Sequence, residues 1–165
     1  RVVVATHPDE ALALLADPTP AERDVLGAFR YAANDVVLHR DPSLMPQARL
    51  ARSSWNYLIG SPGGASDQES GPVVTYWMNR LQGIDEATPL YVTLNATDRI
   101  DPASIIAEMT YSHPVYDVAA VAAQRRLPEI RTATTAFAGA YAGWGFHEDG
   151  CRSGAEAAEH FGVTW

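Results

Sequence analysis

The sequence predicts an α+β fold, with α/β-type segments at both ends of the chain and an antiparallel sheet between them. Three observations lead to this prediction. A strand pattern followed by a helix pattern occurs near the start, over residues 2–15, and the same order recurs near the end, over residues 135–162. The middle of the chain consists of short runs of β-branched and aromatic residues with polar connections. We expect segments 1–30 and 130–165 to form one partial domain and residues 31–129 to form a second.

The first expected element is a continuous apolar run, Val2–Ala5, which is typical of a buried strand. Thr6 is the expected N-cap of a helix that reaches about Leu15. Chain termini normally lie outside packed elements, and here a strand follows Arg1 directly. We therefore expect the sequence to be a piece of a longer polypeptide.

The next segments predict a helix and then a sheet. Thr19 and Glu22 have the spacing of a capping box, and the helix that they begin is expected to end near Gly27. An antiparallel sheet of about four strands is expected from residues 31–39, 53–58, 73–78 and 90–94. A further strand over residues 105–111 would be broken at His113-Pro114. The glycine- and serine-rich segment Gly60–Pro72 is expected to be a loop.

A third helix is predicted over residues 115–127. Val118, Val121 and Ala122 would lie on one face of it and form its apolar side. Pro128 would end it, because proline cannot continue a helix.

The composition excludes several classes of partner. The chain has 165 residues and a net charge of −8, which argues against nucleic acid and against an anionic membrane surface. No apolar run is long enough to span a bilayer. The single cysteine, Cys151, fits a reducing compartment, so a cytoplasmic location is expected. The 12 basic residues are all arginine, which excludes a catalytic or phosphate-binding lysine.

The most informative segment is the end of the chain. A strand from Thr135 to Ala138 is predicted to enter a glycine-rich loop, after which a helix runs from about Glu148 to Gly162. This order presents free backbone N–H groups and the positive end of a helix dipole to a ligand. Glu148 and Asp149 would repel a phosphate there, so a neutral acceptor such as a ring carbonyl fits better.

Small residues recur on this last helix. Gly150, Gly154 and Ala158 follow one another at every fourth position, which predicts a face that closely approaches a sheet or a flat ligand. A tight contact between the helix and the sheet, with no ligand, is the alternative interpretation.

Two further groups of residues are candidates for a site. Aromatic residues on the predicted sheet would line an apolar substrate cavity or simply form sheet core: Trp55, Tyr57, Tyr76 and Trp77. A metal site made by His113, His147 and Glu148 is a weaker hypothesis, because no metal-binding spacing occurs among them. We therefore predict no metal.

Several stretches together resemble the C-terminal portion of the flavin-containing amine oxidase and phytoene desaturase superfamily. More closely, they resemble its bacterial predicted NAD/FAD-binding, amine-oxidase-like group, to which the segments Trp77–Gln82 and Gly145–Gly150 are specific. The resembling stretches are Val2–Leu12, Val37–Pro46, Ser54–Tyr57, Val74–Gln82, Leu90–Asn95, Tyr111–Asp117 and the tail from Phe137.

The resemblance implies that the chain is the C-terminal part of a two-domain FAD-dependent amine-oxidase-like fold. Segments 1–30 and 130–165 would belong to the FAD domain, and residues 31–129 to the substrate domain. The implied cofactor contacts are Gly139, Ala140, Tyr141, Gly145, Phe146, His147, Glu148 and Asp149. The superfamily's pattern has glycine where Asp149 stands, and an acidic residue where Ala140 and Tyr141 stand. Its N-terminal dinucleotide-binding motif is not in this chain.

The expected function is therefore that of a C-terminal segment of an FAD-dependent oxidoreductase, inactive in isolation. The full-length enzyme would move a hydride from an apolar or amine substrate to the flavin. The expected partners are that small molecule, the missing N-terminal FAD-binding half and, through the exposed docking face, a second copy. The alternative is a self-contained, non-catalytic ligand-binding or interaction domain.

Overall fold

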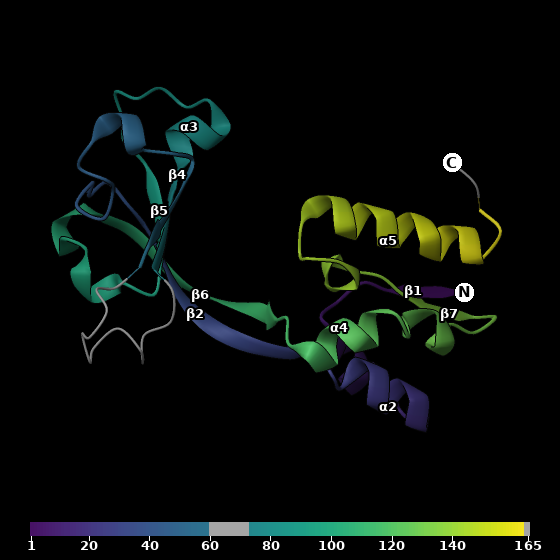
Figure 1. Ribbon diagram of the computed structural model, residues 1–165. Helices are drawn as coiled ribbons and strands as arrows, with labels where there is room; N and C mark the ends of the chain where they lie inside the picture. Colours follow the sequence, from purple (N-terminus) through teal and green to yellow (C-terminus); the bar gives the residue numbers. More distant parts are fainter. Residues whose placement is uncertain (60–72, 164–165) are drawn as a thin grey trace. The chain divides into compact units, whose positions relative to one another are not determined.

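The computed structural model describes residues 1–59 and 73–163, and the predicted loop Gly60–Pro72 lies outside the described residues. The α+β class is confirmed, because helices occur together with an antiparallel sheet (Figure 1). The chain divides into two compact units. Unit 1 contains Arg1–Ala32 and His113–Trp165, and unit 2 contains Ala33–Ser112.

Unit 1 is built on two parallel strands, β1 (Val2–Val4) and β7 (Thr135–Phe137). Side chains of neighbouring strand residues point to opposite faces, so the pair has two sides to cover. Phe137 packs in a cluster with residues of three helices: α1 (Pro8–Leu14), α2 (Pro20–Leu26) and α4 (Val118–Gln124). Ala136 and Ala138 pack instead against α5 (His147–His160). Figure 1 shows α5 on one side of β1 and β7, and α2 and α4 on the other.

The start of the chain differs from the sequence prediction in two respects. Val2 and Val3 are 57% and 42% exposed, although the apolar run predicts a buried strand. The reason is that β1 has a single neighbouring strand, β7, among the described residues. The N-cap of α1 is His7 instead of Thr6.

The capping box of α2 is confirmed. The Glu22 backbone N–H donates to Thr19 Oγ1 at 3.2 Å, and the Thr19 backbone N–H donates to Glu22 Oε2 at 2.7 Å. The helix ends at Leu26, with Gly27 as its C-cap, as predicted.

The apolar face predicted for α4 is wrong. Val118 is 89% exposed, whereas Ala120 and Ala123 are buried. The small side chains allow α4 to pack closely in the cluster that contains Leu26, so they form the contact in place of the larger valine. This packing also assigns α4 to unit 1, while the sequence places the helix in the second domain, before residue 130.

Unit 2 contains a sheet of five strands, which correspond to the predicted four and to the further strand predicted over residues 105–111. The strand order is β3-β4-β5-β2-β6, and the first four are joined by antiparallel pairs. Their bounds are β3 Trp55–Leu58, β4 Val73–Trp77, β5 Tyr91–Leu94, β2 Arg30–His39 and β6 Ile105–Val115. A short helix, α3 (Met78–Gln82), follows β4 and ends at Gly83, whose φ of +67° is a conformation that glycine adopts easily. The described 3₁₀ helices are Arg49–Ala51, Thr97–Arg99, Pro102–Ser104, Leu127–Ile130 and Ala140–Ala142.

The predicted strand break at His113-Pro114 does not occur. Strand β6 runs without interruption through Pro114 to Val115. Strand β6 lies at the edge of the sheet, and proline is tolerated in edge strands because one side of such a strand forms no ladder hydrogen bonds.

The buried face of the sheet carries a row of hydrogen-bonded polar side chains. His39 Nε2 lies 2.8 Å from Thr93 Oγ1, and Thr93 Oγ1 lies 2.9 Å from Thr75 Oγ1. The Asn56 amide continues the row by donating to the Thr75 carbonyl at 3.2 Å. His39 and Thr93 are fully buried. Four strands are thus linked by side chains as well as by backbone.

Candidate functional site

The loop between β7 and α5 is held in place by one carboxylate. Asp149 Oδ2 accepts hydrogen bonds from the backbone N–H groups of Trp144, at 2.9 Å, and Phe146, at 3.1 Å. Its Oδ1 accepts from Arg152 at 2.9 Å. The Asp149 side chain is only 13% exposed. The sequence predicted this residue as a charge near the helix dipole, and the structure shows that it also fixes the loop backbone.

Two glycines in the loop are required by close contacts. A Cβ on Gly143 would overlap the Asp149 carboxylate. Gly145 has a φ of +88°, and a Cβ there would lie 2.7 Å from the Tyr116 hydroxyl. The loop therefore cannot keep this path with larger residues at either position.

The first glycine of the loop is tied to α5. The Gly139 N–H donates to Ser153 Oγ at 2.8 Å, and the Ser153 hydroxyl is placed to donate to the Gly139 and Gly150 carbonyls. Ser153 is buried. These bonds occupy the Gly139 N–H, which the sequence analysis placed among the cofactor contacts.

The structure divides the predicted cofactor contacts into an exposed and a buried group. Residues Gly145–Glu148 are exposed, while Gly139, Ala140 and Asp149 are half-buried. Tyr141 lies in the core of unit 1, where its ring meets Phe29 edge-on at 5.2 Å. Burial raises the pKa of Tyr141 to about 12. Tyr141 is therefore a packing residue and does not face the loop surface.

The exposed group surrounds the N-terminus of α5. The first helical N–H groups, at His147 and Glu148, have no acceptor one turn earlier in the helix. Trp144 is 62% exposed and Phe146 is 56% exposed. This surface, residues Trp144–Glu148, combines backbone donors that have no acceptor within α5 with two apolar rings, and we call it the α5 entrance.

The small-residue face predicted for α5 does not make its packing contact. A Cβ on Gly154 would meet nothing within 4 Å, and one on Gly150 would meet only Ala140 at ordinary contact distance. The buried residues of α5 are Ser153 and Ala157, each three positions after one of these glycines, so the glycines lie at the margin of the buried side. The pattern therefore indicates the correct side of α5, but the closest packing is made by Ser153 and Ala157 instead of by the glycines.

The hypothesis of a metal site gains no support from side-chain positions. Within residues 1–59 and 73–163, no group of three or more His, Cys, Asp or Glu side chains is arranged to hold a metal ion. Cys151 is a free, exposed thiol. His160 hydrogen-bonds the Thr132 carbonyl at 2.8 Å, which is a structural role.

Only three of the four predicted cavity aromatics share a face of unit 2. Trp55 pairs with Tyr76 across β3 and β4, and their rings meet edge-on at 5.4 Å. Tyr57 lies on the same face as Trp55, and both are more than half exposed. Trp77 points to the opposite face, because it follows Tyr76 directly in β4. The three form an open aromatic surface.

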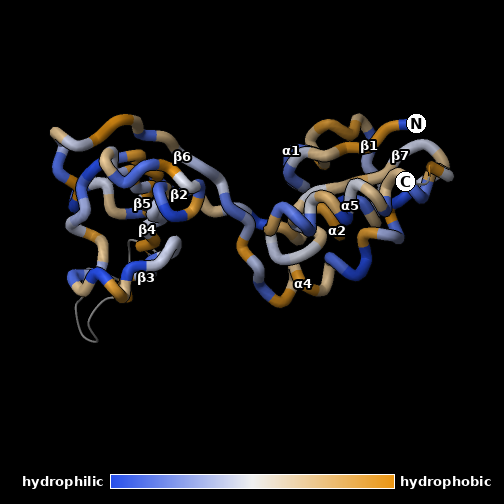
Figure 2. Tube along the Cα trace, turned by 90° about the horizontal axis from the view of Figure 1, so that it is seen from above, coloured by the Kyte–Doolittle hydropathy of each residue, from blue (hydrophilic) through white to orange (hydrophobic). Residues whose placement is uncertain are grey.

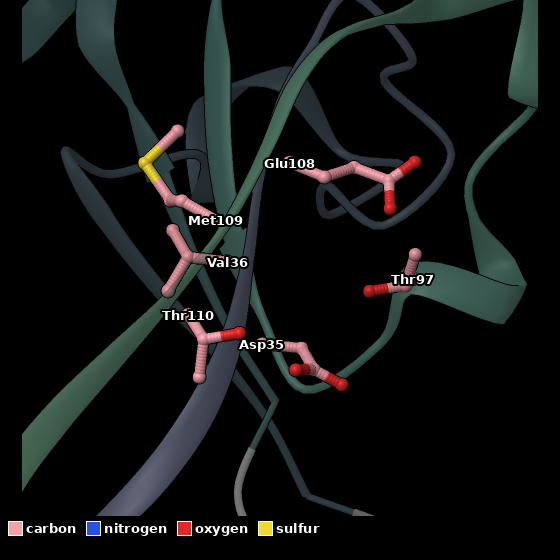
Figure 3. A pocket seen from close by; sticks show the side chains of 6 residues that line it. All are labelled: Asp35, Val36, Thr97, Glu108, Met109 and Thr110. Atoms are coloured by element: carbon pink, nitrogen blue, oxygen red, sulfur yellow. The ribbon is translucent and has the colours of Figure 1, made fainter.

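Unit 2 also has a pocket that the sequence analysis missed. Its volume is about 280 Å³, and its lining residues are Asp35, Val36, Thr97, Glu108, Met109 and Thr110. Figure 3 shows the carboxylates of Asp35 and Glu108 and the side chain of Thr97 turned toward the same space. The only available signal was the presence of an acidic residue within each strand, and pairing of β2 with β6 was needed to join them.

No family model and no curated protein matches this sequence. The resemblance to flavin-containing amine oxidases therefore stays a prediction. None of the helices formed by residues 1–59 and 73–163 has the length and apolar composition that a membrane crossing needs.

Proposed function

We propose that the chain is the C-terminal segment of an FAD-dependent, amine-oxidase-like oxidoreductase and that the α5 entrance forms one edge of its flavin site. The observation that carries this proposal is the start of α5, where the N–H groups of His147 and Glu148 have no acceptor within the helix and the rings of Trp144 and Phe146 are exposed. Backbone donors suit a ring carbonyl, and apolar rings suit the flat body of the same molecule.

The charge at the α5 entrance supports a neutral ligand edge over a phosphate. Asp149 already occupies the loop N–H groups of Trp144 and Phe146, and Glu148 adds a second carboxylate in the first helical turn. Arg152 offsets part of this charge from one side. An anionic group would be repelled here, whereas a carbonyl oxygen would still accept from the free N–H groups.

The open sheet of unit 1 supports membership of a larger domain. Parallel sheets have helices on both faces and normally contain more than two strands. Here helices pack on both sides of β7, yet the described residues supply only two strands to the sheet, β1 and β7.

FAD, when bound, would supply the hydride acceptor for oxidation of a substrate C–H bond. This chain would contribute the backbone donors of His147 and Glu148, and Asp149 would keep their loop in position. The pyrophosphate and adenosine would be held by the missing N-terminal half. The aromatic surface of Trp55, Tyr57 and Tyr76 suits an apolar or amine substrate, and the free thiol of Cys151 suits the cytoplasm.

A substitution at the first position of α5 tests the flavin contact. His147→Pro removes the backbone N–H, and proline is well tolerated at this position of a helix. Phe146 already has an extended conformation, with a ψ of 160°, which suits a residue before proline. In the polypeptide encoded by the full reading frame, we expect lower FAD occupancy for His147→Pro and unchanged occupancy for His147→Ala. Equal occupancy in both would contradict the role of this N–H.

The chain by itself tests the claim that it is part of a site. We expect the purified chain to retain no FAD through gel filtration, because it supplies only the edge of the ring. A stable yellow flavin spectrum would overturn that expectation. A reading frame without a glycine-rich βαβ segment before Arg1 would contradict the proposed enzyme class.

A non-catalytic binding domain is the second candidate, and the pocket of unit 2 favours it. Asp35 and Glu108 would attract a small cationic ligand. Calorimetric titration with a diamine would show binding that Glu108→Gln weakens if this candidate is correct.

A further inference from the structure

The edge of β1 that faces away from β7 presents a backbone N–H and C=O that are not paired with another strand. Val2 donates to the Thr134 carbonyl at 2.7 Å, and Val4 accepts from the Ala138 N–H at 3.0 Å, so both residues face β7. In a parallel ladder alternate residues point to opposite edges, so the N–H and C=O of Val3 face away from β7. Within the described part of the chain, no strand other than β7 pairs with β1. Water can reach these two groups, and another extended strand can bond both of them at this spacing.

The protective feature that this edge does have is its short length of three residues. Val2–Val4 contains no proline and no charge, and Figure 2 colours this strand as hydrophobic. Arg1 carries the nearest charge, and its side chain is bound at the C-terminal end of α5. Its guanidinium donates to the Phe161 carbonyl at 2.6 Å and lies 5.6 Å from the centre of the Phe161 ring. The side chains of Val2 and Val3 are therefore exposed, and the strand itself carries neither a charge nor a proline.

The edge is also complementary to itself. A two-fold axis through Val3, perpendicular to the sheet, would pair β1 with an antiparallel β1 of a second copy. The two Val3 residues would then exchange both N–H···O=C bonds, and Val2 of each copy would lie opposite Val4 of the other. Arg1 would lie opposite Ala5, so no like charges meet. Both copies would keep α5 on the same side of the joined sheet.

We propose that this chain forms a homodimer through antiparallel pairing of β1 with β1 of a second copy, which joins two strand pairs into one four-stranded sheet. The inference concerns unit 1 alone and does not require the proposed function. A flavin-free dimer would support it whatever the outcome of the FAD experiments.

Sedimentation equilibrium of the 165-residue chain provides the test. We expect a species of twice 17.8 kDa that dissociates on dilution. Val3→Pro removes the outward N–H but no hydrogen bond to β7, so it should raise the dimer dissociation constant about 30-fold through two lost bonds. Val3→Thr, which keeps the N–H and the strand preference, is the matched control and should remain dimeric.

A second variant covers the case in which the proline disturbs β1. Val3→Lys places two like charges opposite each other at the axis and should also give monomers with an unchanged circular dichroism spectrum. A monomeric wild-type chain would overturn the proposal. A dimer that survives both Val3→Pro and Val3→Lys would overturn it as well.

Cross-linking fixes the register. In a Cys151→Ser background, Val3→Cys should form a disulfide-linked dimer on oxidation, since residues paired at the axis lie about 5.5 Å apart between Cα atoms. Val2→Cys should not, because the two Val2 residues are offset along the strands. Cross-linking of Val2→Cys in preference to Val3→Cys would overturn the proposed register.

Discussion

Units 1 and 2 differ in how they satisfy polar groups. Unit 2 places His39, Thr75 and Thr93 in its core and bonds them to one another across a five-stranded sheet. Unit 1 has an apolar core and leaves polar backbone groups at its surface, at the β1 edge and at the α5 entrance. The difference is that unit 2 pairs polar side chains with one another inside its core, whereas unit 1 has polar backbone groups exposed at the β1 edge and at the α5 entrance.

The largest expected effect tests the apolar core of unit 1. Leu26 is fully buried between α2 and its neighbours, so Leu26→Ala should lower the free energy of unfolding by about 3 kcal/mol. Val118→Ala, at an 89% exposed site on α4, is the control and should change it by less than about 0.5 kcal/mol. Urea denaturation monitored by circular dichroism measures both. Similar losses for the two variants would refute the apolar face assigned to α4.

The next effect tests the polar core of unit 2. Thr93→Val removes the shared hydroxyl and leaves His39 Nε2 and Thr75 Oγ1 without their partner, which should cost about 2 kcal/mol. Thr93→Ser keeps the hydroxyl and should lose less. The urea midpoints of Thr93→Val and Thr93→Ser measure the two losses of stability. If valine were better tolerated than serine, packing at this site would matter more than the hydrogen bonds.

A smaller effect is expected at the α5 entrance. Asp149→Ala frees the N–H groups of Trp144 and Phe146, which water can reach, so the loss should be about 1 kcal/mol. Amide hydrogen exchange at these two positions should become faster. Arg152→Ala removes only an exposed ion pair and should leave the exchange unchanged. Unchanged exchange in Asp149→Ala would contradict the role given to this carboxylate.

The smallest effect is a pH dependence of unit 2. Burial lowers the pKa of His39, against the opposing influence of Asp41, so the unfolded state binds the proton more tightly than the folded state. Stability should be fully present above the unfolded pKa of about 6.5 and should be lost as the pH falls below it. Melting temperatures between about pH 7.5 and about pH 5.5 measure the loss, which His39→Gln should reduce. An equally steep loss in His39→Gln would assign it to other groups.

Local signals in the sequence predicted the structure well, and signals that depend on distant neighbours did not. The capping box of Thr19 and Glu22 is a contact between residues three apart, and it is present as predicted. The exposure of Val2 and the continuity of β6 through Pro114 depend on how many strands lie beside each one. The number of neighbouring strands cannot be read from the local sequence of a strand.

The candidate site shows the same limit. The helix start at His147 and the exposed loop before it follow from residues close in sequence. The burial of Tyr141 follows from its contact with Phe29, and the pocket joins Asp35 to Glu108; both bring together residues that are far apart along the chain. No local pattern distinguishes these residues from their neighbours.

The polar row of unit 2 has a consequence for how its strands find one alignment. Strand β4 reads Val73-Val-Thr-Tyr-Trp77, so its two faces are almost equally apolar and burial alone would barely distinguish them. A slip by one residue would bring Tyr76 toward Thr93 and turn the hydroxyl of Thr75 to the outer face. Each misaligned pairing would then leave a buried group unbonded. The hydrogen bonds among His39, Thr75 and Thr93 therefore favour the native strand register over a register shifted by one residue.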